Sequence, residues 1–200
     1  MKWLVYVLCM PDASQTTIVF DIESTGLNKT DKVTVICTEE FETGKKRVYN
    51  FCKATSNADR KLLIDTLTSE FDAATSLCAY NGIRFDLPFM QNDLRIPAKK
   101  ITEWVLKTSD ILEQLRLRES TVCKLDHLCE INNLATKSSD GCAAVRMARE
   151  GQWEELEKYC ANDVHILCEL YRKRILKHPF KRGEYIDLQA HVCDGFYNND

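Results

Sequence analysis

The sequence predicts one α/β domain, in which a sheet forms first along the chain and helices then pack across it. Runs of β-branched and aromatic residues, separated by turn residues, dominate the region from residue 17 to residue 52. Helical periodicity dominates the later part, up to residue 175. The 200 residues, of which 28% are charged and 44% hydrophobic, suffice for one globular domain with a substantial core. This order of elements is typical of an α/β protein.

The predicted sheet opens with three strands that follow one another as a meander. The first strand begins near Thr17 and ends at Gly26, and residues 32–38 and 47–52 form the next two. Residues 42–45 make the turn between the second strand and the third. A helix over residues 58–71 and a short buried strand at residues 77–80 follow.

Helices are predicted for most of the remaining chain. One begins at Asp86, with Pro88 in the first turn, where proline is tolerated. Residues 104–112 are expected to form a further strand, and its Asp110 is given no ligand role. Residues 124–129, a segment capped by Asp140, and a long amphipathic stretch over residues 153–175 are expected to be helical.

The first strand carries two carboxylates one residue apart, Asp21 and Glu23. Side chains alternate along a strand, so both carboxylates point to one side and Ile22 points to the other. Adjacent carboxylates repel each other unless a cation lies between them, and their hard oxygens suit Mg²⁺ or Mn²⁺. A solvated strand edge is the alternative, and two further acidic segments favour the metal site over it.

The second acidic segment joins a turn to the start of a helix. Asn81-Gly82 is a strong turn signal, and Asp86 begins the apolar helical stretch that follows. Asp86 is therefore either a helix N-cap or a metal ligand, and Phe85 is either a core residue or a ligand contact.

The third acidic segment lies within the long amphipathic helix. Tyr159 and Asp163 are one turn apart and share a face of that helix. An acidic side chain beside an apolar stripe is unfavourable unless it is paired or bound to a metal. The alternative is an exposed residue at the boundary of the stripe.

In their order, these segments resemble the motifs of the DEDD superfamily of 3′–5′ exonucleases: Asp-x-Glu, then Asn-x-x-x-Phe-Asp, then Tyr-x-x-x-Asp. The tyrosine is similar to that of the DEDDy branch, which includes the proofreading domains of family A and family B DNA polymerases and the RNase D group. The histidine branch would have its histidine where this chain has Lys158. The resemblance spans roughly residues 17–171, and it implies a ribonuclease-H-like fold with a mixed β-sheet flanked by helices.

The resemblance also implies a metal-dependent 3′–5′ exonuclease, a phosphodiester hydrolase acting on 3′ ends of DNA or RNA, with DNA slightly favoured. It implies two divalent cations, Mg²⁺ or Mn²⁺, held by four carboxylates: Asp21, Glu23, Asp86 and Asp163. Tyr159 would orient the attacking water, because a phenol is a poor base but a good hydrogen-bond donor. The residues implied in substrate binding are Gly26, Leu27, Asn81 and Phe85.

Two other functions fit the same fold. A catalytically inactive nucleic-acid-binding or scaffolding module would be marked by loss of a metal ligand, and all four implied ligands are present. An endonuclease would differ only in its cleavage products. The choice between DNA and RNA depends on a 2′-hydroxyl contact that a sequence does not show.

Charge is distributed unevenly along the chain. The net charge of −3 gives no overall basic footprint for nucleic-acid binding. One local basic patch stands out, and it is equally open to phosphate contact and to a solvated helix end: Arg172, Lys173, Arg174, Lys177, Lys181 and Arg182.

Composition and the termini complete the expectations. The ten cysteines include no C-x-x-C pair and no zinc spacing, which favours free thiols and a reducing intracellular compartment, either cytoplasm or nucleus. Residues 1–16 are expected to form an N-terminal extension, residues 17–177 the exonuclease domain, and residues 178–200 a tail with no clear periodicity. No segment is long enough for a membrane span, and a protein partner is left unspecified.

Overall fold

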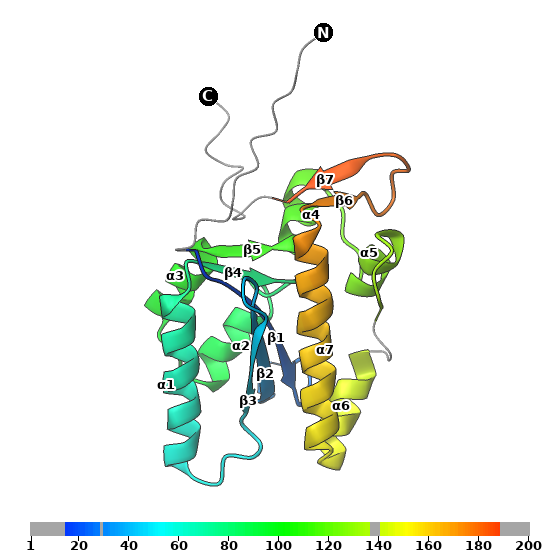
Figure 1. Cartoon of the computed structure of the whole chain (residues 1–200). Helices are drawn as coiled ribbons and strands as arrows, with labels where there is room; N and C mark the ends of the chain where they lie inside the picture. Colours follow the sequence, from blue (N-terminus) through cyan, green and yellow to red (C-terminus); the bar gives the residue numbers. More distant parts are fainter. Residues whose placement is uncertain (1–14, 29, 137–140, 189–200) are drawn as a thin grey trace.

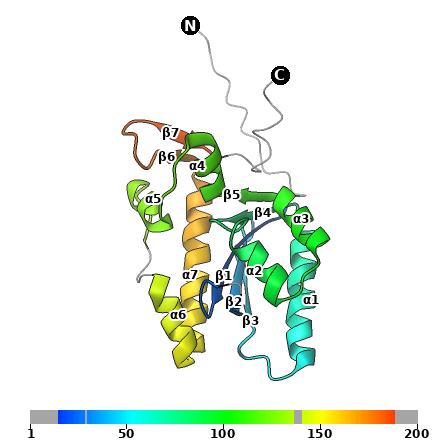
Figure 2. The ribbon, with the colours of Figure 1, turned by 180° about the vertical axis from the view of Figure 1, so that it is seen from behind.

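A five-stranded mixed sheet forms the centre of the protein, and helices cover both of its faces (Figure 1, Figure 2). The computed structural model describes residues 15–28, 30–136 and 141–188. Most of the predicted N-terminal extension, the predicted cap Asp140 and residues 189–200 of the tail lie outside the described residues. The predicted α/β class is confirmed.

The first three strands form the predicted antiparallel meander: β1 (Thr17–Ser24), β2 (Val33–Glu40) and β3 (Lys45–Asn50). Two strands then extend the sheet in parallel, β4 (Ser76–Ala79) beside β1 and β5 (Thr108–Asp110) beside β4. The resulting order is β3-β2-β1-β4-β5. The central strand is therefore the one that carries the Asp-x-Glu motif.

One face of the sheet packs against α1 (Asn57–Ala73), α2 (Asp86–Asp93) and α3 (Ala98–Leu106). Phe20 of β1 contacts Phe71 of α1, and Phe71 contacts Trp104 of α3, each pair with 4.9 Å between ring centroids. Ile22 belongs to the same buried cluster. The even-numbered residues of β1 thus point into this half of the core.

The opposite face packs against α7 (Trp153–Arg172), and α4 (Ile111–Glu119), α5 (Leu125–Ile131) and α6 (Gly141–Glu150) lie on the same side (Figure 2). Val19 of β1 shares a buried cluster with Leu156 and Val164 of α7. Because side chains alternate along a strand, Asp21 and Glu23 continue the face of Val19. Both carboxylates therefore point toward the α7 side.

The prediction of a single strand over residues 104–112 is wrong. Helix α3 continues to Leu106, β5 has only three residues, and α4 begins at Ile111. Trp104 is buried on a helical face instead of a strand face. Asp110 ends the strand because its Oδ1 accepts the N–H of Glu113 (3.1 Å) and so caps α4.

The long helix ends at Arg172 instead of residue 175, because Arg174 has a φ of +58° and cannot continue a right-handed helix. The chain then forms a hairpin of β6 (Ile175–Lys177) and β7 (Tyr185–Asp187). This hairpin crosses the predicted boundary between residues 177 and 178, and the described part of the tail is thus an appended structural element.

Cysteines serve mainly as small apolar residues. All those whose state the structure describes are free thiols, and five of them are buried: Cys37, Cys78, Cys129, Cys160 and Cys168. Within the described ranges, no helix combines the length and apolar character needed to cross a membrane.

Candidate active site

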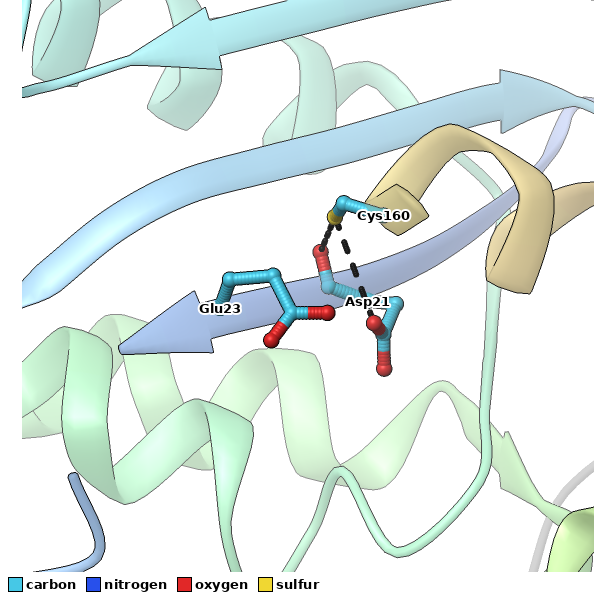
Figure 3. A group of neighbouring side chains, drawn as sticks. All are labelled: Asp21, Glu23 and Cys160. Atoms are coloured by element: carbon cyan, nitrogen blue, oxygen red, sulfur yellow. Dashed lines mark hydrogen bonds between the residues drawn. The ribbon is translucent and has the colours of Figure 1, made fainter. Parts of the chain in front are cut away.

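The carboxylates of Asp21 and Glu23 lie side by side on the α7 face of β1, and both side chains are half-buried (Figure 3). They follow three fully buried residues of the strand, so the sheet core fixes the backbone from which they project. The predicted common orientation of the two carboxylates is therefore present in the structure.

Cys160 of α7 completes this group. Its Sγ lies 3.4 Å from the backbone oxygen of Asp21 and 4.0 Å from Asp21 Oδ2 (Figure 3). One ligand atom from each of Asp21, Glu23 and Cys160 lies within 4.8 Å of the others. Burial raises the pKa of the Cys160 thiol well above its usual range, and neighbouring Cys37 and the two carboxylates add to the shift. The thiol is therefore protonated near neutral pH and donates to the Asp21 carbonyl.

Sequence reasoning assigned Cys160 only to the apolar stripe. Its proximity to Asp21 depends on how closely α7 crosses β1, which periodicity does not reveal. The available signal was its position beside Tyr159 and three residues before Asp163, inside the third motif.

Asp86 is hydrogen-bonded to the backbone of β1, beyond the point where β1 stops pairing with β4. Its Oδ1 accepts the backbone N–H of Ile22 at 3.1 Å. The parallel pairing of β1 with β4 ends at Val19 and Cys78, so this N–H needs another acceptor. Asp86 is the first residue of α2 and not its N-cap, which is Phe85. The N-cap alternative is therefore wrong.

The electrostatic environment links Asp86 to Asp21. Burial raises the pKa of Asp86 well above its usual range, and the carboxylates of Asp21 and Asp110 raise it further. A buried carboxyl with carboxylate neighbours is more stable when it is protonated or when a cation is bound. This environment fits a metal ligand better than an ordinary surface aspartate.

The third motif is buried. Asp163 is 2% exposed and Tyr159 is 8% exposed, both on α7 within one turn of Cys160. The alternative of an exposed boundary residue for Asp163 is therefore wrong. Among the described residues, the group within 4.8 Å contains neither Asp86 nor Asp163. Asp86 is linked to it through the bond from Ile22 and the charge of Asp21, and Asp163 lies three residues after Cys160 on α7.

Asp110 holds the loop of the second motif. Its two carboxylate oxygens accept the N–H groups of Asn81 and Ile83, each at 2.9 Å. Asn81 has a φ of +70°, a left-handed conformation that this clamp stabilises. Burial raises the pKa of Asp110, whereas the backbone N–H donors oppose the shift. Asp110 thus holds the backbone of this loop.

A small hollow lies beside this loop. It has a volume of about 180 Å³ and is lined by Leu27, Arg84, Phe85, Pro88, Phe89 and Asn92. Leu27 and Phe85, two of the residues implied in substrate binding, therefore line the same hollow. Leu27 is 77% exposed, and the rings of Phe85 and Phe89 lie 4.8 Å apart. An apolar, partly exposed hollow of this kind suits a stacked base.

Arg84 was not predicted as part of the hollow. Its guanidinium makes two hydrogen bonds to Glu113 of α4, at 2.6 and 2.8 Å, and these bonds lower the pKa of Glu113. The pair ties the second-motif loop to α4. Arg84 is thereby fixed at the hollow with its side chain still half-exposed.

Gly26 has a clear packing role. A Cβ at this position would lie 2.6 Å from Asp31 Oδ2, and Asp31 accepts hydrogen bonds from Asn28 N–H (2.7 Å) and Thr25 Oγ1 (3.2 Å). The turn that presents Leu27 therefore requires glycine on packing grounds, whatever contact Gly26 makes with a substrate.

The donor set fits a hard divalent cation. Asp21 and Glu23 supply adjacent carboxylate oxygens, and Asp86 lies where its negative charge is disfavoured without a cation. A protonated thiol such as that of Cys160 is a weak ligand beside these oxygens. The residues therefore fit a divalent metal ion.

We expect Asp86→Asn to raise the melting temperature of the metal-free protein near pH 7 and to leave it almost unchanged near pH 4. The raised pKa of Asp86 means that the folded state holds this proton more tightly than the unfolded state. The resulting stability is complete below the ordinary carboxyl pKa of about 3.9 and is lost as pH rises toward the raised value. Asparagine keeps the oxygen that accepts the Ile22 N–H and has no proton to lose.

Thermal unfolding in excess chelator across this pH range measures the effect. Asp65→Asn on the exposed side of α1 is the matched control, because it removes the same charge from a solvated site. Equal melting temperatures of wild type and Asp86→Asn near pH 7 would contradict the environment assigned to Asp86.

Comparisons with known proteins agree with this architecture. The sequence profile of a family described as the RNase_H superfamily matches residues 18–175. The fold is similar to that of the family B DNA polymerase from the hyperthermophilic archaeon Pyrobaculum calidifontis, with a TM-score of 0.59, 17% sequence identity and 80% of this chain covered. The match covers 24% of the polymerase chain, so this protein spans about a quarter of its length. No curated protein matches the sequence significantly. The ribonuclease-H-like fold expected from the sequence is confirmed.

Proposed function

The chain belongs to the RNase H superfamily, and from this membership we propose that it is a metal-dependent nuclease that removes nucleotides from 3′ ends. One observation carries the proposal. Asp21 and Glu23 of the central strand point toward α7, which carries the buried third motif, and Asp86, which bonds to the same strand at Ile22, directly follows Phe85 of the hollow. Such a combination of cation ligands and a stacking surface suits hydrolysis at the end of a strand.

Four carboxylates would hold two divalent cations, Mg²⁺ or Mn²⁺: Asp21, Glu23, Asp86 and Asp163. When bound, the cations activate the attacking water and stabilise the charge that develops at the phosphate. The two buried carboxylates are held by different elements, Asp86 by its bond from Ile22 and Asp163 by the packing of α7. The positions of the ligands thus depend on the fold and not on mobile side chains.

The remaining site residues would bind and orient the terminal nucleotide. Leu27 and Phe85 offer apolar contact to a base, and Asn81 lies at the turn where its side chain would meet the sugar-phosphate. The hollow is small and matches a single base, which favours removal of one terminal nucleotide over cleavage within a duplex. DNA remains slightly favoured as the substrate.

Cleavage of single-stranded DNA and RNA oligonucleotides with a label at the 5′ end tests the proposal. In Mg²⁺ or Mn²⁺, we expect a ladder that shortens one nucleotide at a time from the 3′ end. Internal cuts would favour the endonuclease. Binding without cleavage of either nucleic acid in any of these metals would favour the inactive module.

We expect Tyr159→Phe to lower the single-turnover cleavage rate by about 10- to 100-fold, at or below the low end for a positioned proton-handling group. The hydroxyl lies one helical turn from Asp163 and would orient the attacking water, whereas the buried ring would keep its packing. Metal affinity and melting temperature should hardly change. Tyr171→Phe, which removes the hydroxyl of another buried tyrosine further along the same helix, is the matched control. An unchanged rate would assign the orientation of water to another residue.

A further inference from the structure

The β6–β7 hairpin lies beyond the C-terminal end of α7 (Figure 1). Basic and aromatic side chains are among its exposed residues. We call this the hairpin surface and define it by five exposed residues: Lys177, Phe180, Lys181, Arg182 and Tyr185. It follows the last residue of α7, whereas Cys160 lies in the first half of that helix. The hairpin surface is thus separate from the candidate active site.

Hydrogen bonds fix the backbone conformation of the hairpin loop. His178 is buried, and its Nδ1 accepts the backbone N–H groups of Phe180 (3.1 Å) and Lys181 (2.9 Å). The N–H of His178 donates to the carbonyl of Glu184 at 2.9 Å, which closes the loop. Leu176, on β6, is fully buried and anchors the hairpin to the core. The exposed side chains are therefore presented from a fixed backbone.

Phe180 is the central feature of the hairpin surface. It is 63% exposed and stacks on His127 of α5, with 5.6 Å between ring centroids and 22° between the ring planes. It lines two adjacent hollows, of about 500 Å³ and about 420 Å³. Tyr185, which is 64% exposed, lines the larger one. Exposed rings beside open hollows are suited to stacking of successive bases.

The charges of the hairpin surface are not explained by the end of α7. A helix dipole favours cations in the last turn, and this accounts for Arg172 and its neighbours. Lys177, Lys181 and Arg182 instead belong to β6 and the hairpin loop. Glu119 and Glu184 lie 3.4 and 3.5 Å from Lys181 Nζ and offset part of the charge. The cations thus border the larger hollow, whereas Asp126 and Glu130 line the smaller one.

We propose that the hairpin surface binds single-stranded nucleic acid, with bases stacked on Phe180 and Tyr185 and phosphates near Lys177 and Arg182. The inference rests on the proposed function, because the bound strand is the part of the substrate upstream of its 3′ end. Cations alone would also suit an acidic peptide, but the exposed rings of Phe180 and Tyr185 beside the larger hollow favour bases. The hairpin surface would therefore increase the affinity for long strands but not for short oligonucleotides.

Binding is measured by fluorescence anisotropy with labelled 15-nucleotide single-stranded DNA and RNA in excess chelator, where no cleavage occurs. We expect Phe180→Ala to weaken binding on the order of 5- to 100-fold, the effect of losing one base–aromatic stack. Leu62→Ala is the matched control, because Leu62 is an equally exposed apolar residue on α1. The melting temperature of Phe180→Ala should stay close to that of the wild type, since the ring is mostly exposed.

A second pair of variants tests the charges independently. Lys177→Gln/Arg182→Gln should weaken binding and reduce the slope of log K against log salt by about 1.4, two single-strand phosphate contacts at about 0.7 each. Lys61→Gln/Lys99→Gln, on α1 and α3, changes the net charge equally at distant exposed positions. The proposal would be overturned if both Phe180→Ala and Lys177→Gln/Arg182→Gln bound the strand with wild-type affinity. It would also be overturned if the hairpin double variant and the distant double variant lost equal affinity.

Cleavage separates this proposal from the proposed function. Arg172, which precedes the hairpin, lies twelve residues beyond Cys160 on α7, about 18 Å away at a rise of about 1.5 Å per residue. A trinucleotide spans about 10 Å at about 3.4 Å per nucleotide, so we expect both hairpin variants to degrade it at the wild-type rate. If the wild type cleaves nothing and the hairpin variants lose strand binding, the nuclease is refuted and the hairpin surface is kept. Normal cleavage with unaffected strand binding in both variants would refute the hairpin surface and keep the nuclease.

Discussion

Asp21→Asn is expected to abolish cleavage, with a fall of at least about 10³-fold in the single-turnover rate. As a metal ligand, Asp21 would contribute several kcal/mol to stabilisation of the transition state, and each 1.4 kcal/mol is about tenfold in rate. Asp21 is linked to three other residues of the site. Its backbone oxygen accepts from Cys160, its carboxylate lies beside Glu23, and its charge raises the pKa of Asp86. Asparagine has the same size, so the packing should survive.

Asp163→Asn should have the same effect, because this carboxylate is buried on the helix that brings Cys160 to β1. Asp65→Asn on α1 serves as the control for loss of a carboxylate at an exposed site. Circular dichroism and thermal unfolding should show folded protein for all three variants. Near-normal cleavage by Asp21→Asn or Asp163→Asn would remove that residue from the site.

The strand pattern was predictable because the hydrophobic effect imposes a simple period on β1. Phe20 and Ile22 had to be buried on one face, which left Asp21 and Glu23 on the other. The same reasoning placed Tyr159 and Asp163 one turn apart on α7. Local periodicity therefore determined which way each candidate side chain points within its own element.

Distances between elements were not predictable in this way. The contact of Cys160 with Asp21 depends on the crossing of α7 over β1, and the bond from Ile22 to Asp86 depends on where β4 stops pairing. Both are consequences of packing between segments more than 60 residues apart in sequence. A single sequence carries no direct signal for such contacts.

Short elements were the other source of error. β5 has three residues, and its limits are set by Asp110, whose carboxylate binds three backbone N–H groups at once. β6 and β7 also have three residues each, too few to show a period of two above noise. Their positions depend on single buried residues such as Leu176 and Ile186, paired across the hairpin.

The second large effect expected is complete loss of cleavage in excess chelator, with full recovery on addition of Mg²⁺ or Mn²⁺. Asp21 and Glu23 place their oxygens within one small volume, and Asp86 is buried next to them, so the site favours an added positive charge. Without that charge, we expect the site to bind a strand end without hydrolysing it. Turnover in excess chelator at the metal-loaded rate would contradict the proposed mechanism.

Metal binding itself should be visible without any substrate. A ligand that binds only the folded state stabilises it by about 2.7 kcal/mol at a concentration 100 times its Kd, so Mn²⁺ should raise the melting temperature of the wild type in a concentration-dependent way. Asp21→Asn lacks one of the central oxygens and should show a much smaller rise. A rise of equal size in this variant would mean that the cation binds elsewhere, and the four carboxylates would then need a different role.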